Sequence, residues 1–560
     1  MAEKFPCSHR PRRWPTTLRK MVAVELRRRY GARRSNYRLA KALLLLRSEI
    51  ANFTSGQEDD ATAHTMTHRG AEMSTDGRPF EQVLRRRDVF AVGFGSMIGF
   101  GWVVLAGEYI GEAGILGSAL AFMVGGSIVG LVGLTYAELV SAMPKAGGEH
   151  HYVLRALGTR WAFVASWAVA MGYISVVAFE AVALPETVAY LVPELPSQTL
   201  WSVAGSPVYA TWVAVGIAGA VVVTVVNYMG VRPASFLQTI AVFFLLCVGA
   251  LLLLGSFVGG SPANAEPLFA GGSIGVLGVV VATPFLFLGF DVIPQSAEET
   301  NLPSRQIGKI LILSVVMAAA WYMLVQITVG TAMSRHDIVE SDLATADAMT
   351  SLWNSEVMGD VLILGGITGI MTSWNGLLIG ASRLLYAMGA SGMLPRWFAR
   401  VHAKYQSPSN AILFIGGISL LAPLFGVRML TWLSNAGAVN ILLGYLLVSV
   451  SFVVLRRREP NLDWPYRVSA TRSVGGLAIL LSAVLIVLCL PGMPAALTWP
   501  YEWVIVSLFW AVGMGFLLFV PRIPAGPQAE EHLLKPAFVC EQGNLSFTCG
   551  RKVPLLARIT

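Results

Sequence analysis

Twelve apolar segments, each about long enough to cross a bilayer, follow one another between residues 89 and 520. A helix needs about 20 apolar residues to span the hydrocarbon core. Backbone groups in hydrocarbon must pair within the chain, so only helices and closed barrels cross it. With 55% hydrophobic and 13% charged residues, the chain is too apolar for a soluble protein of its length. The sequence therefore predicts an all-α integral membrane protein with twelve transmembrane helices, at residues 89–112, 115–142, 161–192, 206–228, 234–258, 275–299, 306–333, 357–389, 410–427, 429–456, 473–491 and 500–520.

Glycines interrupt two of these segments. The first contains Gly95-Ser96-Met97-Ile98-Gly99-Phe100-Gly101, and the sixth contains Thr283-Pro284-Phe285-Leu286-Phe287-Leu288-Gly289-Phe290-Asp291. A helix can break at membrane depth only where the freed N–H and C=O groups meet protein, water or a solute. Corresponding breaks in two halves of a chain are typical of a substrate site at the midplane of a transporter. The pattern predicts a transporter.

Basic residues alternate between the loops on the two sides. Arg85, Arg86 and Arg87 precede the first segment, whereas loops 193–205 and 259–274 contain neither Lys nor Arg. The positive-inside rule therefore predicts that both termini are cytoplasmic. The net charge of +8 is mostly this topology signal, because the basic residues flank the segments and form no nucleic-acid-binding patch.

Five cysteines are scattered along the chain without the spacing of metal ligands. We therefore predict no metal site and no cofactor. No nucleophile paired with a base occurs in the apolar segments either, so we expect that the protein is not an enzyme.

Composition divides the chain into three parts. Residues 1–85 are predicted to be a basic, disordered extension, residues 86–521 the transmembrane domain, and residues 522–560 a cytoplasmic tail. The extension could also be an arm that binds anionic lipid heads. A third interpretation is that it is not translated, because Met66 and Met73 lie closer to the first apolar segment.

Four stretches carry a resemblance to a known family. They lie at the end of the second segment, and in the first, sixth and eighth segments: Tyr136-Ala137-Glu138-Leu139 with Pro144-Lys145-Ala146-Gly147-Gly148, Gly95 to Gly101, Gly289-Phe290-Asp291 with Glu298-Glu299-Thr300, and Ser382-Arg383-Leu384-Leu385-Tyr386. In order and spacing they resemble the motifs of amino acid permeases in the amino acid, polyamine and organocation superfamily. The resemblance covers about residues 85–470.

The resemblance implies a LeuT-like fold of two inverted five-helix repeats followed by two C-terminal helices. Each repeat would open with a broken helix, in agreement with the glycine pattern. It also implies that Phe285 is an aromatic gate that closes over the substrate.

The two breaks supply the candidate binding groups. Free N–H groups near Gly99 and Gly101 lie at the positive end of a helix dipole and suit an anion such as a carboxylate. Carbonyl groups of the second break suit an ammonium group. The alternative for the glycines is close helix packing through small residues. The predicted substrate-binding residues are Met97, Gly99, Gly101, Phe285, Leu286, Leu288 and Gly289.

Two departures from the family pattern bear on mechanism. Phe100 stands between the glycines where members that bind α-amino acids often have Ser or Thr, and Phe donates no hydrogen bond. Either the backbone alone binds the carboxylate or the substrate lacks one. The fifth segment has no Lys or Arg, although several relatives have a Lys there. Ion coupling must therefore be arranged otherwise.

Carboxyl groups at membrane depth are the candidates for ion coupling. Burying a charge in the membrane costs free energy, so such residues usually have a function. Glu180 either pairs with a substrate amine or carries the coupling proton, or it is protonated and only joins helices. Asp291 either caps the inner half of the sixth segment or contacts ion or substrate. Thr372 and Ser373 could bind Na⁺ together with carbonyl groups of the first segment.

Two carboxyl groups nearer the cytoplasm have a different predicted role. Glu138 and Glu298 are expected to be gate or anchor residues paired with Arg or Lys.

These observations predict a secondary active transporter in the inner cell membrane, which carries a small-molecule substrate, an amino acid or a related organic amine, by alternating access and is coupled to H⁺ or Na⁺. The chain has no GxxxxGK[ST] nucleotide-binding motif, so an ion or an exchanged solute must drive it. The alternatives are an obligate exchanger and, in a different class, a membrane nutrient sensor without transport.

Overall fold

The computed structural model describes residues 80–341, 343–493 and 496–529. Most of the predicted N-terminal extension and of the predicted tail therefore lies outside the described residues. The elements, in chain order, are α3 (Arg86–Met97), α4 (Gly101–Val104), α5 (Ala106–Ala113), α6 (Ile115–Ala142), α7 (Glu149–Leu157), α8 (Thr159–Leu191), β1 (Thr199–Val203), β2 (Ser206–Tyr209), α9 (Ala210–Tyr228), α10 (Val231–Val258), η1 (Pro262–Ala265), α11 (Gly272–Leu286), α12 (Val292–Gln295), η2 (Ala297–Glu299), α13 (Ser304–Ala332), α14 (Arg335–Glu340), α15 (Ala344–Trp353), α16 (Glu356–Ala390), η3 (Arg396–Ala399), α17 (Ser409–Leu421), η4 (Ala422–Phe425), α18 (Arg428–Arg458), α19 (Thr471–Leu488) and α20 (Tyr501–Leu517).

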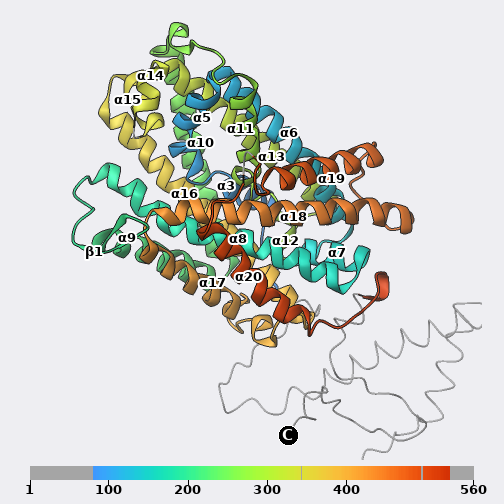
Figure 1. Cartoon of the computed structure of the whole chain (residues 1–560). Helices are drawn as coiled ribbons and strands as arrows, with labels where there is room; N and C mark the ends of the chain where they lie inside the picture. Colours follow the sequence, from blue (N-terminus) through green and yellow to red (C-terminus); the bar gives the residue numbers. More distant parts are fainter. Residues whose placement is uncertain (1–79, 342, 494–495, 530–560) are drawn as a thin grey trace, which may run out of the picture. The chain divides into compact units, whose positions relative to one another are not determined.

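The described part of the chain is a bundle of apolar helices (Figure 1). Within it, eight helices are long and apolar enough to cross a membrane: α6, α8, α9, α10, α13, α16, α18 and α19. The apolar helices α11, α17 with η4, and α20 are shorter, and the first predicted segment is divided among α3, α4 and α5. The protein is therefore a multi-pass membrane protein in which every predicted segment overlaps a helix.

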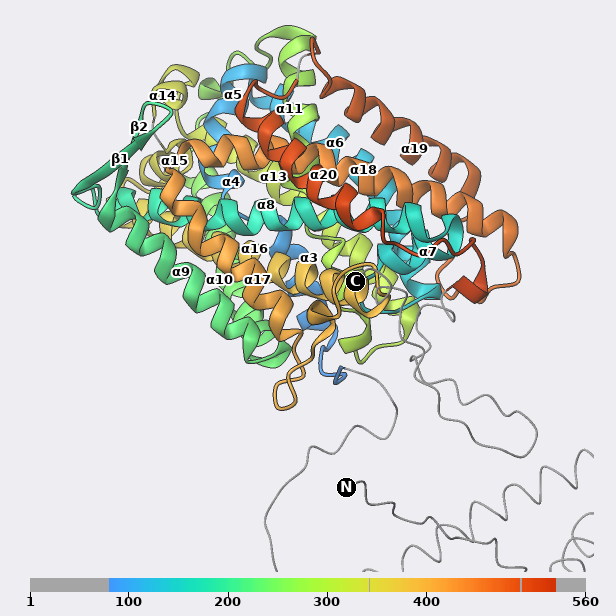
Figure 2. The same ribbon diagram turned by 60° about the horizontal axis from the view of Figure 1, so that its bottom comes forward.

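The centre and the edge of the bundle differ in how much of each helix is buried. Helix α8 packs against α16 and α18 and runs through the middle of the bundle (Figure 2), and 89% of its most apolar stretch is buried. The corresponding shares are 33% for α10 and 28% for α19. The exposed residues of α10 include Phe243 and Phe257. Such apolar side chains suit contact with lipid, whereas most side chains of α8 contact other helices.

Both glycine-containing segments are broken, as predicted. Helix α3 ends at Met97, and helix resumes at Gly101 with a single turn of four residues, α4, followed by α5. Helix α11 ends at Leu286, five residues follow without regular helix, and α12 is again a single turn of four residues.

The inner half of the sixth segment is shorter than the sequence suggested. A helix was expected to continue to residue 299, but α12 ends at Gln295 and the short 3₁₀ helix η2 follows. Pro294 lacks a backbone N–H, and the Ser296 hydroxyl donates to the carbonyl of Val292 at 3.1 Å. The proline lies in the first turn of α12 and prevents that turn from continuing the helix before the break, whereas the serine hydroxyl competes for a carbonyl of the same turn.

Several elements between the apolar segments were not anticipated. Strands β1 and β2 pair as an antiparallel hairpin whose turn residues Ala204 and Gly205 both have positive φ, as a type I′ turn requires. The fourth apolar segment therefore begins as a strand and becomes helical at Ala210. Helices α7, α14 and α15 lie in other connections and are too short and too polar to give a membrane signal.

Candidate functional site

The two helix breaks touch each other at Gly289. Its φ is +133°, a conformation that disfavours a side chain. A Cβ atom there would also lie 2.5 Å from the Cβ of Ser96 and 2.6 Å from the Ser96 carbonyl carbon. Glycine is therefore required both by backbone conformation and by the close approach of the last turn of α3.

Tyr322 of α13 joins the two breaks from the side. Its hydroxyl lies 2.9 Å from the carbonyl oxygen of Met97 and 3.2 Å from that of Leu286, and it can donate to one of them at a time. Its ring stacks on Phe122 with centroids 4.9 Å apart. The sequence analysis missed this residue, although a tyrosine inside an apolar segment needs a partner for its hydroxyl and could have signalled it.

Glu180 of α8 lies against the first break. Its side chain is buried, and a Cβ atom at Gly99 would overlap its Oε1. The hydroxyl of Ser373 and the backbone N–H of Phe100 interact with the carboxyl group. Its Oε2 has no hydrogen-bond partner among the described residues.

Residues from three distant segments thus meet at this point. The same Cβ atom at Gly99 would lie 3.0 Å from both Cβ and Oγ of Ser373 on α16. The structure therefore brings together Gly99, Glu180 and Ser373, three residues that the sequence analysis selected separately. An N–H group that was expected to face a substrate carboxylate instead faces a carboxyl group of the protein itself.

Three phenylalanine rings form a series of edge-to-face contacts between the two breaks. Phe100 and Phe179 meet edge to face with centroids 5.7 Å apart, and Phe179 and Phe285 do the same, also at 5.7 Å. Phe285 is half-buried, whereas the other two are buried. Phe179 precedes Glu180 in the sequence, so α8 supplies both the middle ring and the carboxyl group.

The other predicted residues of the breaks serve packing more directly. A Cβ atom at Gly101 would overlap the side chain of Leu286, so this glycine permits close contact between α4 and α11. Leu286 and Leu288 are buried. The alternative of close packing thus describes Gly101, while Gly99 faces a carboxyl group.

The two hydroxyl groups considered for Na⁺ are placed differently. Thr372 donates to the carbonyl of Gly369 in its own helix at 2.8 Å. Ser373 faces the first break. A Cβ atom at Gly369 would lie 2.9 Å from the carbonyl oxygen of Ile98 and 3.4 Å from that of Gly99, so these oxygens lie against α16 near Ser373.

Asp291 follows the second break and is fully buried. It is the residue before α12, but its side chain makes no capping hydrogen bond to that helix. Instead its Oδ1 accepts the backbone N–H of Gly289 at 3.1 Å, and its Oδ2 has no hydrogen-bond partner among the described residues. Asp291 therefore stabilises the turn of the break itself.

The predicted anchor at Glu138 is present. Its Oε1 lies 2.9 Å from Nε of Arg456, and its Oε2 accepts the backbone N–H of Val468 at 2.7 Å. Glu298 lies near His151 and Lys145. The charges of those two residues and the N–H of Ala146 act on its carboxyl group.

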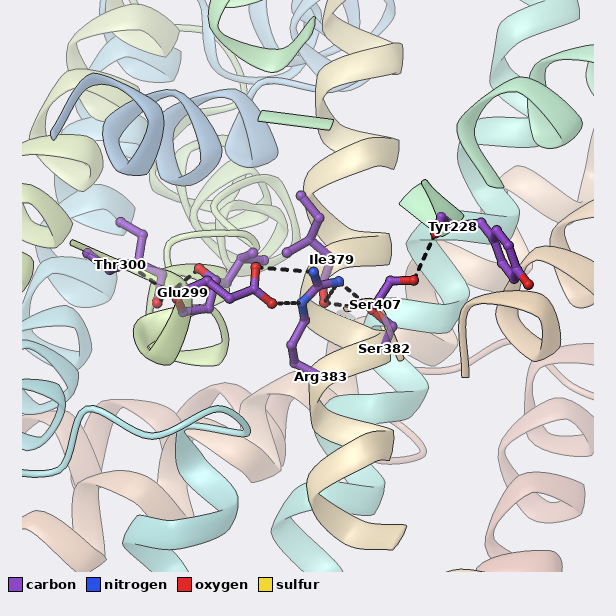
Figure 3. A network of polar contacts seen from close by, with 10 residues as sticks. Tyr228, Glu299, Thr300, Ile379, Ser382, Arg383 and Ser407 are labelled. Atoms are coloured by element: carbon purple, nitrogen blue, oxygen red, sulfur yellow. Dashed lines mark hydrogen bonds and ion pairs between the residues drawn. The ribbon is translucent and has the colours of Figure 1, made fainter. Parts of the chain in front are cut away.

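A second anchor uses the residue next to Glu298. Arg383 of α16 donates from Nε to Glu299 Oε1 at 2.9 Å and from Nη2 to Oε2 at 3.2 Å, and both side chains are about 1% exposed (Figure 3). The backbone carbonyl of Glu299 accepts the N–H groups of Val83 and Leu84, each at 2.9 Å. Glu299 therefore ties the segment before α3 to α16.

Comparisons with known proteins agree with this architecture. The family model for amino acid permeases matches residues 84–534. The branched-chain amino acid permease BcaP of Bacillus subtilis is 26% identical over 71% of this chain and 86% of its own length. Human cationic amino acid transporter 4 is 30% identical over 70% of this chain and 62% of its own length. The lysine-specific permease LysP of Escherichia coli is 24% identical over 70% of this chain and 83% of its own length. Because the family model covers most of the sequence, including both broken helices and the helices that carry Glu180 and Ser373, this chain belongs to the amino acid permease family.

Proposed function

We propose that the protein is a secondary active permease that carries an amino acid or a related organic amine across the inner cell membrane by alternating access. In this proposal the twelve segments form two inverted five-helix repeats and two trailing helices, with both termini cytoplasmic. The observation that carries the proposal is the Glu180 carboxyl group, buried against the first helix break with one oxygen unpartnered among the described residues.

Glu180 gives the site an affinity for an amine. A buried carboxylate needs a cation or a proton. A substrate ammonium placed between Glu180 and the carbonyl groups of the breaks would neutralise the carboxylate and donate hydrogen bonds to those carbonyl oxygens. We therefore assign the amine, rather than the carboxylate, as the group of the substrate that Glu180 recognises.

The three phenylalanine rings give the site an apolar side. Phe100, Phe179 and Phe285 would enclose the rest of the substrate, and Phe285, the half-exposed ring, would be the one that moves when the site opens. This composition favours a substrate with an apolar side chain. BcaP, named as a branched-chain amino acid permease, is a relative for which such a site would be suitable.

We propose that ion coupling uses the same site around Glu180. Glu180 can exchange a proton for a substrate amine, because a neutral carboxylic acid and an ammonium–carboxylate pair are both compatible with burial. A sodium ion bound by Ser373 and the carbonyl groups of Ile98 and Gly99 is the second possibility supported by geometry.

The test is uptake by purified protein in proteoliposomes, with a panel of radiolabelled amino acids and amines and with imposed H⁺ or Na⁺ gradients. Glu180→Gln keeps the shape of the side chain and removes its charge, and we expect uptake to fall at least about tenfold, as for loss of one charged hydrogen bond. Glu186→Gln is the matched control, because Glu186 lies on the same helix and contacts Trp212 Nε1 at 3.3 Å instead of the break.

Each outcome decides between the candidates. Wild-type uptake in Glu180→Gln would remove Glu180 from the site. Binding without accumulation under any gradient or internal exchange substrate would support the nutrient sensor instead. Uptake that requires an internal substrate but no ion gradient would identify an obligate exchanger.

A further inference from the structure

Three buried amide side chains form a hydrogen-bonded chain that links the membrane helices α9, α16 and α10. They are Asn227, Asn375 and Gln238, which are 1%, 7% and 1% exposed. Asn227 Nδ2 donates to Asn375 Oδ1 at 2.8 Å, and Asn375 Nδ2 donates to Gln238 Oε1 at 2.7 Å. Polar side chains at membrane depth cost free energy and usually have a function.

The acceptors fix the orientation of every amide in this chain. The remaining acceptors are backbone carbonyl groups: that of Val223 for Asn227 at 3.0 Å, that of Ala234 for Asn375 at 3.2 Å, and those of Thr372 and Ala91 for Gln238 at 2.9 and 3.3 Å. Each amide nitrogen thus has two acceptors, which uses both of its N–H groups. The chain therefore runs in one direction, from Asn227 to Gln238.

A cavity of about 70 Å³ adjoins this chain. Gln238 and Asn375 line it together with apolar side chains such as Val222, Leu237 and Met371. Because both amides use their N–H groups within the protein, they have no donor left for a ligand in the cavity. The amide chain therefore serves the helices that it joins.

The chain joins α10 and α16 more firmly than it joins α3. Three of its hydrogen bonds cross between α10 and α16: Asn375 donates to Gln238 and Ala234, and Gln238 donates to Thr372. One bond, the longest of the chain, reaches Ala91 of α3. Gln238 is therefore the point at which the pair of α10 and α16 holds α3.

Gly95 permits this approach of α3. A Cβ atom at Gly95 would lie 2.7 Å from Gln238 Nε2 and 2.6 Å from Cγ2 of Val242. The hydroxyl of Thr239, the residue after Gln238, lies 3.1 Å from Asp88 Oδ1 of α3 and supports the same contact. The first glycine of the motif in α3 thus serves the contact with α10, a role that the sequence alone did not indicate.

We propose that Gln238 is a positioning residue that sets the first break against α16. It holds α3 at Ala91, one turn before Gly95, and it holds α16 at Thr372, the residue before Ser373. The first break and Ser373 meet at Glu180, so a shift of α3 relative to α16 alters that site. Asn375 acts through Gln238, because it orients the amide. The effect on substrate affinity rests on the proposed function, whereas the hold on α3 does not.

The test is hydrogen–deuterium exchange of the full-length protein in lipid nanodiscs, read by mass spectrometry in peptides that cover α3. Gln238→Met keeps the length of the side chain and removes both donors. We expect the α3 amides to exchange about three- to tenfold faster, as for loss of one hydrogen bond. Gln326→Met is the matched control, because Gln326 is an equally buried glutamine of α13 whose Oε1 has no hydrogen-bond partner among the described residues. It should leave exchange of α3 unchanged.

A second substitution separates positioning from packing. Asn375→Leu leaves Gln238 in place but frees its amide to rotate, so α3 should exchange faster than in the wild type and more slowly than in Gln238→Met. Adding Asn375→Leu to Gln238→Met should change exchange of α3 no further, since Asn375 reaches α3 through Gln238. Additive effects would indicate two independent packing losses and would overturn the proposal.

Substrate affinity is the second measurement. Gln238→Met should raise the Kd about three- to tenfold and Gln326→Met should leave it unchanged. Wild-type exchange of α3 in Gln238→Met would overturn the proposal, as would faster exchange with unchanged affinity. Should Gln238→Met fail to fold, wild-type exchange of α3 in Asn375→Leu would overturn it. Faster exchange in a protein that binds none of the panel would leave the hold on α3 standing and refute the proposed function alone.

Discussion

Glu180 and Glu299 are buried to almost the same extent and differ in their partners. Glu299 is 1% exposed and is held by two hydrogen bonds from Arg383, whereas Glu180 is 2% exposed and keeps one oxygen free among the described residues. A buried ion pair fixes two elements in one arrangement, because either charge alone is costly. A carboxyl group beside a helix break that has one free oxygen and no ion-pair partner among the described residues can instead be satisfied by a ligand or a proton.

The comparison separates a contact of the scaffold from the proposed site. Glu299 and Arg383 connect η2, the segment before α3 and α16. Glu180 of α8 contacts the N–H of Phe100 in the first break and the hydroxyl of Ser373 on α16. We therefore expect substitutions at the first pair to change stability, and substitutions around Glu180 to change binding.

The largest effect is expected for Arg383→Ala. It leaves the Glu299 carboxylate buried without a cation, and breaking such a pair costs about 3–5 kcal/mol. Thermal unfolding of the purified protein in detergent measures the loss. Arg155→Ala is the control, because the pair of Arg155 and Glu459 is partly exposed, with side chains 15% and 17% accessible, and should cost less. Equal losses would contradict the assignment of Arg383 as the main anchor.

The two glycines of the first break should differ in what they affect. Gly99→Ala forces the Glu180 carboxyl to move, so we expect substrate affinity to fall about tenfold or more, equivalent to about 1.4 kcal/mol. Gly101→Ala instead overlaps Leu286 and should lower stability by about 1–3 kcal/mol with little change in affinity. Equilibrium binding and thermal unfolding of both variants check this; the reverse pattern would exchange their roles.

The pH dependence of stability should reveal Glu149. Its pKa is raised in the folded state, so the folded protein holds a proton that the unfolded chain releases near the ordinary pKa of Glu. Stability is therefore full below that value and falls as the pH rises toward the raised pKa, by about 1.4 kcal/mol per pH unit. Melting temperatures measured across this range should decline for the wild type and decline less for Glu149→Gln. Parallel curves would show that Glu149 is not protonated in the folded state.

Removing the Tyr322 hydroxyl should have a smaller effect. Tyr322→Phe keeps the ring packing on Phe122 and Phe287 and leaves the carbonyls of Met97 and Leu286 without their donor. We expect a loss of about 0.5–1.5 kcal/mol in unfolding free energy. Tyr405→Phe in a loop is a suitable control, and an identical loss there would argue against the bridging role.

The smallest effect is expected for deletion of the first residues. A chain that starts at Met73 keeps Phe80, which packs on Tyr386 with ring centroids 5.0 Å apart, and keeps the N–H groups of Val83 and Leu84. It should insert and transport as the full chain does. A start at Arg85 removes these contacts and should lower the melting temperature. Loss of folding in the Met73 protein would give the earlier residues a structural role.

The sequence was sufficient for features that depend on local chemistry. Apolar length located the helices, and glycine and proline located both breaks. Glu180 was identified because a carboxyl group inside an apolar segment is exceptional whatever surrounds it.

Features that depend on long-range contacts could not be found in this way. Glu298 and Glu299 are adjacent acids, and only the fold shows that the second faces Arg383. From the sequence, Glu149 is an acid in the first turn of a short helix, and its burial arises from the packing of α7 against α8 and α18. Tyr322 becomes significant only once both breaks are known to meet beside it.

The bonds from Val83 and Leu84 to Glu299 also have a consequence for the order of assembly. The residues before α3 are synthesised first, yet their partner carbonyl belongs to the turn after the second break. During translation the N–H groups of these residues therefore lack this partner until the sixth apolar segment has been synthesised. Contacts of such long sequence separation form late. The tie between the segment before α3 and the turn after the second break is thus a product of the finished chain, and a ribosome-bound fragment that ends before residue 299 cannot acquire it.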